Sequence, residues 1–143
     1  MNLDEYKTTD FSDDCQDFKE INRDLINFDD VRKGLWPQLS SVDAIDLTTK
    51  LPLLIEIIDI RYYSIHDINK LSTEMRRKIF ESLLLLINEG QLKIDFNQKN
   101  KQFNFKLVFC QGKKEDIRAY EFMKFKIANV LSPFGQCYIS LKM

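Results

Sequence analysis

The chain has 143 residues, 44% of them hydrophobic and 30% charged, and its formal net charge at pH 7 is −1. This length suits one domain with a sizeable core, so we expect a single domain over residues 1–143, and the composition excludes a disordered or fibrous protein. The leucine-rich run 83–87 is far shorter than the roughly 20 apolar residues that cross a bilayer. The acidic N-terminus lacks the apolar segment of a signal peptide, so we expect a cytoplasmic protein.

Charge is distributed unevenly along the chain. Residues 1–46 carry twelve acidic and five basic side chains, a net charge of −7, whereas the remainder carries 16 basic and 10 acidic ones, a net charge of +6. Either the two parts pack together and compensate one another, or the acidic part faces a basic partner.

The N-terminal half is predicted to be helical. Ser12 can cap a first helix that runs to about Phe28, with apolar residues at helical spacing. Four acids recur at the same spacing and would form an acidic stripe beside the apolar one, although a solvated helix face is the alternative. These acids are Asp13, Asp17, Glu20 and Asp24. After a loop around Gly34 and Pro37, residues 53–62 are predicted to form another apolar helix.

The centre of the chain, residues 64–109, has the pattern of two helices followed by a β-hairpin. Ser64 and Ser72 are candidate N-caps, and Gly90 stands where a glycine would end the second helix. Apolar and polar residues alternate over 92–96 and again over 103–109, which predicts two paired strands. Leu84 and Leu85 lie outside the core face of the second helix and predict that it is covered on more than one side, by another helix of the chain or by a second molecule.

The last part of the chain is predicted to add a helix over residues 113–131 and a strand over 137–143. The predicted fold is therefore α+β, with a helical N-terminal half, a winged-helix-like centre at about 53–109, a small antiparallel sheet, and a C-terminal helix and strand.

In the spacing of NEGQLKI after a leucine-rich helix, residues 64–109 resemble the winged-helix family, whose members mostly bind DNA. This resemblance implies an alternative function, that of a DNA-binding transcriptional regulator. The residues for nucleic-acid contact would be Arg76, Arg77, Lys93, Lys99 and Lys101. Helix phase weighs against it, because Arg77 can pair with Glu81, and Glu74 with Lys78, so that the outer face is no basic stripe.

Residues that carry chemistry are few. The one histidine, His66, cannot face its neighbour Asp67 on a helix, so we expect a structural or surface role. Cys15, Cys110 and Cys137 are odd in number and without a CxxC pair, which argues against a disulfide framework and a zinc site and favours buried thiols. No nucleophile motif or phosphate-binding glycine loop is present, and the DDxxD form of residues 13–17 has no second aspartate-rich segment. We therefore expect no enzyme activity, no cofactor and no metal.

Size, charge distribution and lack of an active site together make the chain similar to the immunity proteins that neutralise bacterial toxins, including those of contact-dependent inhibition systems. This resemblance implies a cytosolic protein that binds a basic toxin, often a nuclease, and occludes its active site, with acidic residues steering the encounter. The candidate contact residues are Asp13, Asp17, Glu20, Asp24, Asp29 and Asp30.

Overall fold

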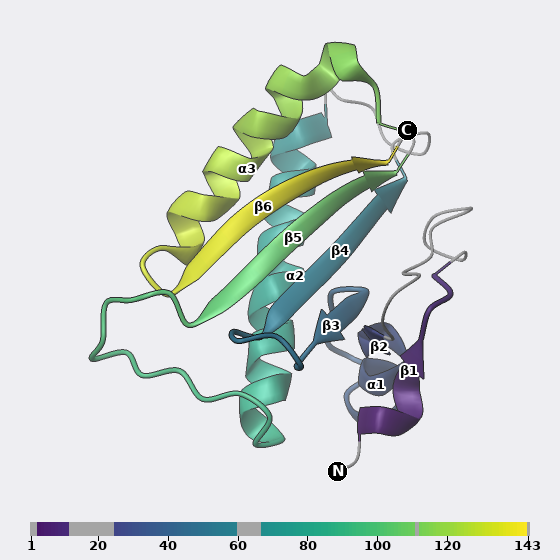
Figure 1. Ribbon diagram of the computed structural model, residues 1–143, viewed down its shortest axis with the longest axis vertical. Coiled ribbons are helices and arrows are strands. Elements are labelled where there is room, and N and C mark those ends of the chain that lie inside the picture. Colours follow the sequence, from purple (N-terminus) through teal and green to yellow (C-terminus); the bar gives the residue numbers. More distant parts are fainter. Residues whose placement is uncertain (1–2, 12–24, 60–66, 111, 143) are drawn as a thin grey trace.

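The structure, a computed structural model, describes residues 3–11, 25–59, 67–110 and 112–142. These residues form one mixed sheet of six strands with α-helices packed on it (Figure 1). The strands are β1 (Lys7–Thr8), β2 (Leu25–Asn27), β3 (Ala44–Asp46), β4 (Leu53–Asp59), β5 (Phe103–Cys110) and β6 (Gly135–Lys142). The helices are α1 (Phe28–Leu35), α2 (Ile68–Asn88) and α3 (Ile117–Leu131). The strands lie in chain order across the sheet.

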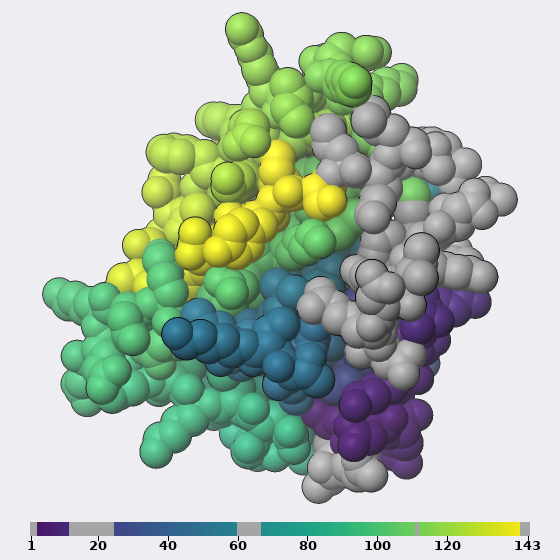
Figure 2. All heavy atoms as spheres, viewed as in Figure 1, coloured from purple at the N-terminus to yellow at the C-terminus, as the bar shows by residue number. Residues whose placement is uncertain are grey.

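The sheet combines an antiparallel half with a parallel half. Strands β1 to β4 pair in antiparallel fashion, whereas β4, β5 and β6 are parallel, with Ile57 opposite Val108 and Val108 opposite Ser140. Parallel neighbours need a crossover connection, which α2 provides between β4 and β5, and α3 between β5 and β6. Both helices pack on the same face of the sheet (Figure 1). On the opposite face, β5 and β6 come to the molecular surface in Figure 2.

The core lies mainly between the sheet and the two long helices. Leu54 and Ile58 of β4 point into this layer, and Ile79 of α2 and Ile127 of α3 meet them from the other side. A smaller cluster, which includes Ile55, covers the opposite face. Strand β4 is thus buried on both faces, as central parallel strands are.

The predicted fold is wrong in its main features. The sheet is mixed and six-stranded rather than small and antiparallel, and strands are interleaved with helices instead of following a helical N-terminal half. Residues 53–59, predicted as a helix, form β4, because a short apolar run rich in isoleucine satisfies a strand with two buried faces as well as a helix.

The winged-helix-like centre is also wrong. From Ile68 on, the two predicted helices are one helix, α2, and Ser72 lies buried within it rather than capping a new one. The other predicted cap, Ser64, lies outside the described residues. Residues 92–96 form no strand, and β5 pairs in parallel with β4 and β6 instead of turning back in a hairpin. Gly90 does follow the end of α2, with the positive φ of 71° that favours glycine at that position.

At the N-terminal side, the predicted first helix falls largely on residues 12–24, which lie outside the described residues. Its predicted end is a strand, β2, and helix α1 begins only at Phe28. The Asn27 side chain caps that helix by accepting a hydrogen bond from the backbone N–H of Asp30. Helix α3 and strand β6 lie where the sequence predicted a C-terminal helix and strand.

The cysteine prediction needs correction at one position. Cys110, at the end of β5, is disulfide-bonded, contrary to the expectation of unpaired thiols. Cys137 on β6 is free and buried, and burial raises the pKa of its thiol to about 12. Cys15 lies outside the described residues.

Candidate functional site

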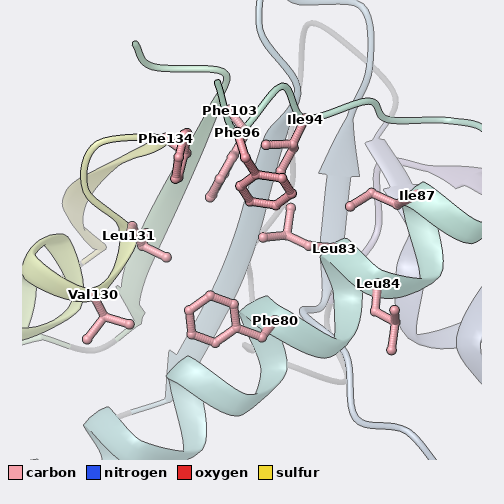
Figure 3. A pocket seen from close by; sticks show the side chains of 10 residues that line it. All are labelled: Phe80, Leu83, Leu84, Ile87, Ile94, Phe96, Phe103, Val130, Leu131 and Phe134. Atoms are coloured by element: carbon pink, nitrogen blue, oxygen red, sulfur yellow. The ribbon is translucent and has the colours of Figure 1, made fainter. Parts of the chain in front are cut away.

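An apolar groove runs beside the C-terminal half of α2 (Figure 3). Helix α2 forms one wall with residues spaced i, i+3, i+4 and i+7, a spacing that puts them on one side of a helix. The other walls are the segment after α2, the start of β5 and the end of α3. The lining residues are Phe80, Leu83, Leu84, Ile87, Ile94, Phe96, Phe103, Val130, Leu131 and Phe134.

The groove has a buried floor and an exposed rim. Leu83 and Phe103 on the floor are 6% and 2% exposed, whereas Leu84 and Phe96 on the rim are 58% and 69% exposed. The ring of Phe96 meets that of Phe134 edge to face, with centroids 5.2 Å apart. The space enclosed is about 250 Å³, and every lining residue is apolar.

Leu84 also borders a second hollow on the other side of α2. This hollow, of about 280 Å³, is lined by Trp36, Gln38, Leu39, Leu84, Leu85 and Asn88. Trp36, just after α1, is 38% exposed. Helix α2 therefore forms a ridge with a recess on each side of Leu84. We refer to this surface as the α2 face and define it by its exposed apolar residues Trp36, Phe80, Leu84, Ile87, Phe96 and Val130.

The α2 face arises from the leucine-rich run of the helix. Leu85 and Leu86 are buried in the core, whereas Leu84 and Ile87 point away from it. The sequence predicted that α2 is covered on more than one side. Leu85 is indeed covered within the chain, whereas Leu84 remains exposed to solvent. A contiguous apolar surface of this kind, rather than scattered apolar residues, marks an interaction site.

A buried polar network, separate from the α2 face, holds the segment before β3 against α2. Glu56 of β4, 1% exposed, accepts hydrogen bonds from Lys78 Nζ at 2.5 Å and from the backbone N–H of Asp43 at 3.1 Å. The Asp43 carboxyl in turn accepts one from the backbone N–H of Ile57 at 2.8 Å. Burial and the neighbouring Glu56 charge raise the pKa of Asp43 to about 8, so that this carboxyl is protonated at neutral pH.

Further hydrogen bonds extend this network along α2. The Ser82 hydroxyl accepts from the backbone N–H of Val42 at 2.9 Å, and the Ser40 hydroxyl donates to Glu81 at 2.7 Å. With Asp43 and Glu56 almost wholly buried, the network joins strand, loop and helix and leaves little surface for a substrate. Among the described side chains, no group of three histidines, cysteines or carboxylates is arranged to hold a metal ion. No sequence signal pointed to this network, because its members come from three separate elements.

Of the six predicted acidic contact residues, four lie outside the described residues, namely Asp13, Asp17, Glu20 and Asp24. Asp29 is engaged within α1, at 2.5 Å from Arg32 and 3.0 Å from Lys33. Burial alone would raise the pKa of Asp29, but the hydrogen bonds and charges of these two bases outweigh it and hold the pKa below its usual value. Asp30 is exposed at the start of α1. The two described members therefore form no acidic patch by themselves.

The residues predicted for nucleic-acid contact do not lie on a wing. Arg77 is paired with Glu81 at 2.8 Å, and Arg76 donates to the Thr73 hydroxyl. The three lysines lie on the segment between α2 and β5, where Lys101 donates to the carbonyl oxygen of Gly135 and where Lys93 and Lys99 are exposed. Nucleic-acid binding through these residues stays a prediction. His66 lies outside the described residues.

Comparisons with protein-family models, with curated proteins and with solved structures found no match for this chain. Within the described ranges, no helix combines the length and the apolar character needed to cross a bilayer.

Proposed function

We propose that this protein is not an enzyme and acts in the cytoplasm by binding another protein in a stoichiometric complex, as an immunity protein binds a toxin. The observation that carries the proposal is the α2 face, an exposed apolar surface with a recess on each side of one helix. Such surfaces on a folded domain are typical of protein–protein interfaces.

The energy available at this face suits a specific complex. Phe80, Leu84 and Phe96 keep 47%, 58% and 69% of their surface in water. Full burial of a side chain of this size contributes roughly 1.5–3 kcal/mol, so each of the three contributes on the order of 1 kcal/mol when a partner covers it. A few such anchors, surrounded by weaker contacts, account for most of the affinity of typical interfaces.

Neutralisation would follow from occlusion. A partner that packs a segment next to its active site against the α2 face cannot at the same time admit its substrate. That a basic toxin is steered by acidic residues stays a prediction; these residues are Asp13, Asp17, Glu20 and Asp24. Such steering would raise the association rate and would not change the packing at the α2 face.

The test is affinity purification of the tagged protein from its native cell lysate, treated with nuclease, followed by native mass spectrometry. We expect one partner protein in a complex of defined stoichiometry, and the partner's own activity should be lost in the complex. Recovery of no protein, or of DNA from untreated lysate, would refute the proposal.

A further inference from the structure

The groove lies between the end of α3 and the C-terminal half of α2 (Figure 3). Helix α2 has 21 residues and α3 has 15, which at about 1.5 Å per residue leaves the longer helix uncovered over part of its length. Lys126 of α3 contacts Asn69 near the start of α2, and Val130 and Leu131 at the end of α3 reach the groove. The last turns of α2 therefore run on beyond α3, with an apolar trough where a further helix could pack.

The lining of the groove favours side chains of a protein over a small molecule. Small-molecule sites combine apolar walls with a few polar groups that orient the ligand, whereas all ten residues that line this groove are apolar. Its volume of about 250 Å³ has room for only a few apolar side chains. An extended peptide is not favoured either, because strand addition needs an unpaired sheet edge and Phe103 belongs to β5, an interior strand.

The charge of the surrounding elements indicates the charge of the occupant. Three segments contribute most of the lining: α2, residues 89–102 and α3. They carry ten basic and five acidic side chains, a net charge of +5. Of these bases, Lys93 directly precedes Ile94 in the chain and Lys99 follows Phe96 by three residues; both are exposed and have no carboxylate partner within the described part of the chain. Acidic groups on the occupant would be attracted to this rim.

We propose that the groove receives an amphipathic α-helix of the partner protein, with apolar residues recurring at i, i+4 and i+7 and acidic residues on its flanks. The apolar residues fill the groove beside α2, as one helix packs against another at 8–10 Å. The acidic flank faces Lys93 and Lys99. This inference deepens the proposed function and rests on it for the existence of a partner.

The test is selection from a displayed library of helix-forming peptides in which apolar, acidic and basic residues are free to occur at every position. The full-length protein is the target, and its Phe96→Ser variant is used to remove peptides that bind elsewhere. We expect the retained peptides to share the apolar i, i+4, i+7 pattern with Asp or Glu on the flanks. Leu84→Ser should weaken their binding at least tenfold, and so should the double change Lys93→Glu and Lys99→Glu.

Two matched controls distinguish binding in the groove from non-specific hydrophobic binding and from non-specific electrostatic binding. Phe125 of α3 is 60% exposed but does not line the groove, so Phe125→Ser should leave peptide binding unchanged. Lys114, exposed near the start of α3, serves in the same way for charge through Lys114→Glu. Peptides with basic flanks, peptides without helical periodicity, no peptide retained, or self-association of the protein through Leu84 would each overturn the inference.

The two experiments fail independently. If acidic helical peptides are selected but no partner is recovered from lysate, the proposed function is wrong while the assignment of the groove stands. If a stoichiometric partner is recovered and its capture is unaffected by Leu84→Ser and by the lysine changes, the protein does bind a partner, and the helix-in-groove inference is wrong.

Discussion

Replacing Asp43 by asparagine should remove most of the pH dependence of stability that the buried network imposes. In the folded protein, burial and the Glu56 charge raise the pKa of Asp43 from 3.8 to about 8. Because the folded pKa is the higher one, the stabilising contribution is fully present below pH 3.8 and is lost as the pH rises through about 8. In the Asp43→Asn variant, the side-chain amide would keep the acceptor for the Ile57 N–H and supply a donor toward Glu56, as the protonated carboxyl does, without binding a proton.

The size of the effect follows from the shift. One proton held by the folded and not by the unfolded chain changes the free energy of unfolding by about 1.4 kcal/mol per pH unit. Between pH 5 and pH 8, the wild-type protein should therefore lose on the order of 4 kcal/mol relative to the Asp43→Asn variant. The assay is urea unfolding of both proteins at several pH values, with the difference in their free energies of unfolding plotted against pH.

A control distinguishes the loss of a hydrogen bond in the network from the loss of a titrating group. Ser82→Ala removes the hydrogen bond from the Val42 N–H in the same network but no titrating group, so its cost should be the same at every pH. A difference between wild type and Asp43→Asn that stays constant from pH 5 to pH 8 would show that Asp43 does not hold a proton in the folded protein.

Three further substitutions test a close contact in the core, a helix cap and the exposure of one side chain. Gly135→Ala should cost about 1–3 kcal/mol in the free energy of unfolding, because its Cβ would lie 2.4 Å from Cζ of the buried Phe103 ring; unchanged urea unfolding would contradict this close approach. Asn27→Ala should cost about 1 kcal/mol by removing the cap on the Asp30 N–H, again measured by urea unfolding, and an unaltered midpoint would argue against the cap. Leu84→Ser should change the free energy of unfolding by less than about 0.5 kcal/mol because the side chain is 58% exposed; a larger loss would mean that Leu84 belongs to the core.

Local signals in the sequence predicted local structure well. The glycine after α2, the apolar face of α3 and the alternation of β6 each depend on residues within a few positions of one another. The alternation over 103–109 likewise predicted a strand, and β5 is one. Alternation does not identify the partner strand, however: β5 pairs with β4, about 50 residues earlier, and with β6, rather than with residues 92–96.

The remaining errors have a common cause. A run such as residues 53–59 is apolar on both sides, so its periodicity cannot distinguish a strand in the middle of a sheet from a buried helix. The misassigned β4 removed the parallel half of the sheet from the prediction and left a hairpin as the simplest arrangement. The network of Asp43, Glu56 and Lys78 depends on that same strand and could not be predicted without it.

The candidate site could be predicted only in part. Leu84 and Leu85 lie off the predicted core face of their helix, and this signalled an additional contact surface. Which of them stays open depends on how α2 is rotated against the sheet: Leu85 is buried and Leu84 is exposed. The rest of the groove comes from Ile94 and Phe96, shortly after α2, and from residues farther along the chain that the tertiary fold brings to α2, namely Phe103, Val130, Leu131 and Phe134.

The most direct test of the central claim is quantitative capture of the partner by three tagged proteins from the same lysate: wild type, the double variant Leu84→Ser and Phe96→Ser, and the control Phe125→Ser. Since truncating an interface anchor often costs more than about 1 kcal/mol, the double variant should retain at least tenfold less partner per tagged molecule than wild type. The control should match wild type. Equal capture by all three proteins would contradict the claim that the α2 face is the binding surface.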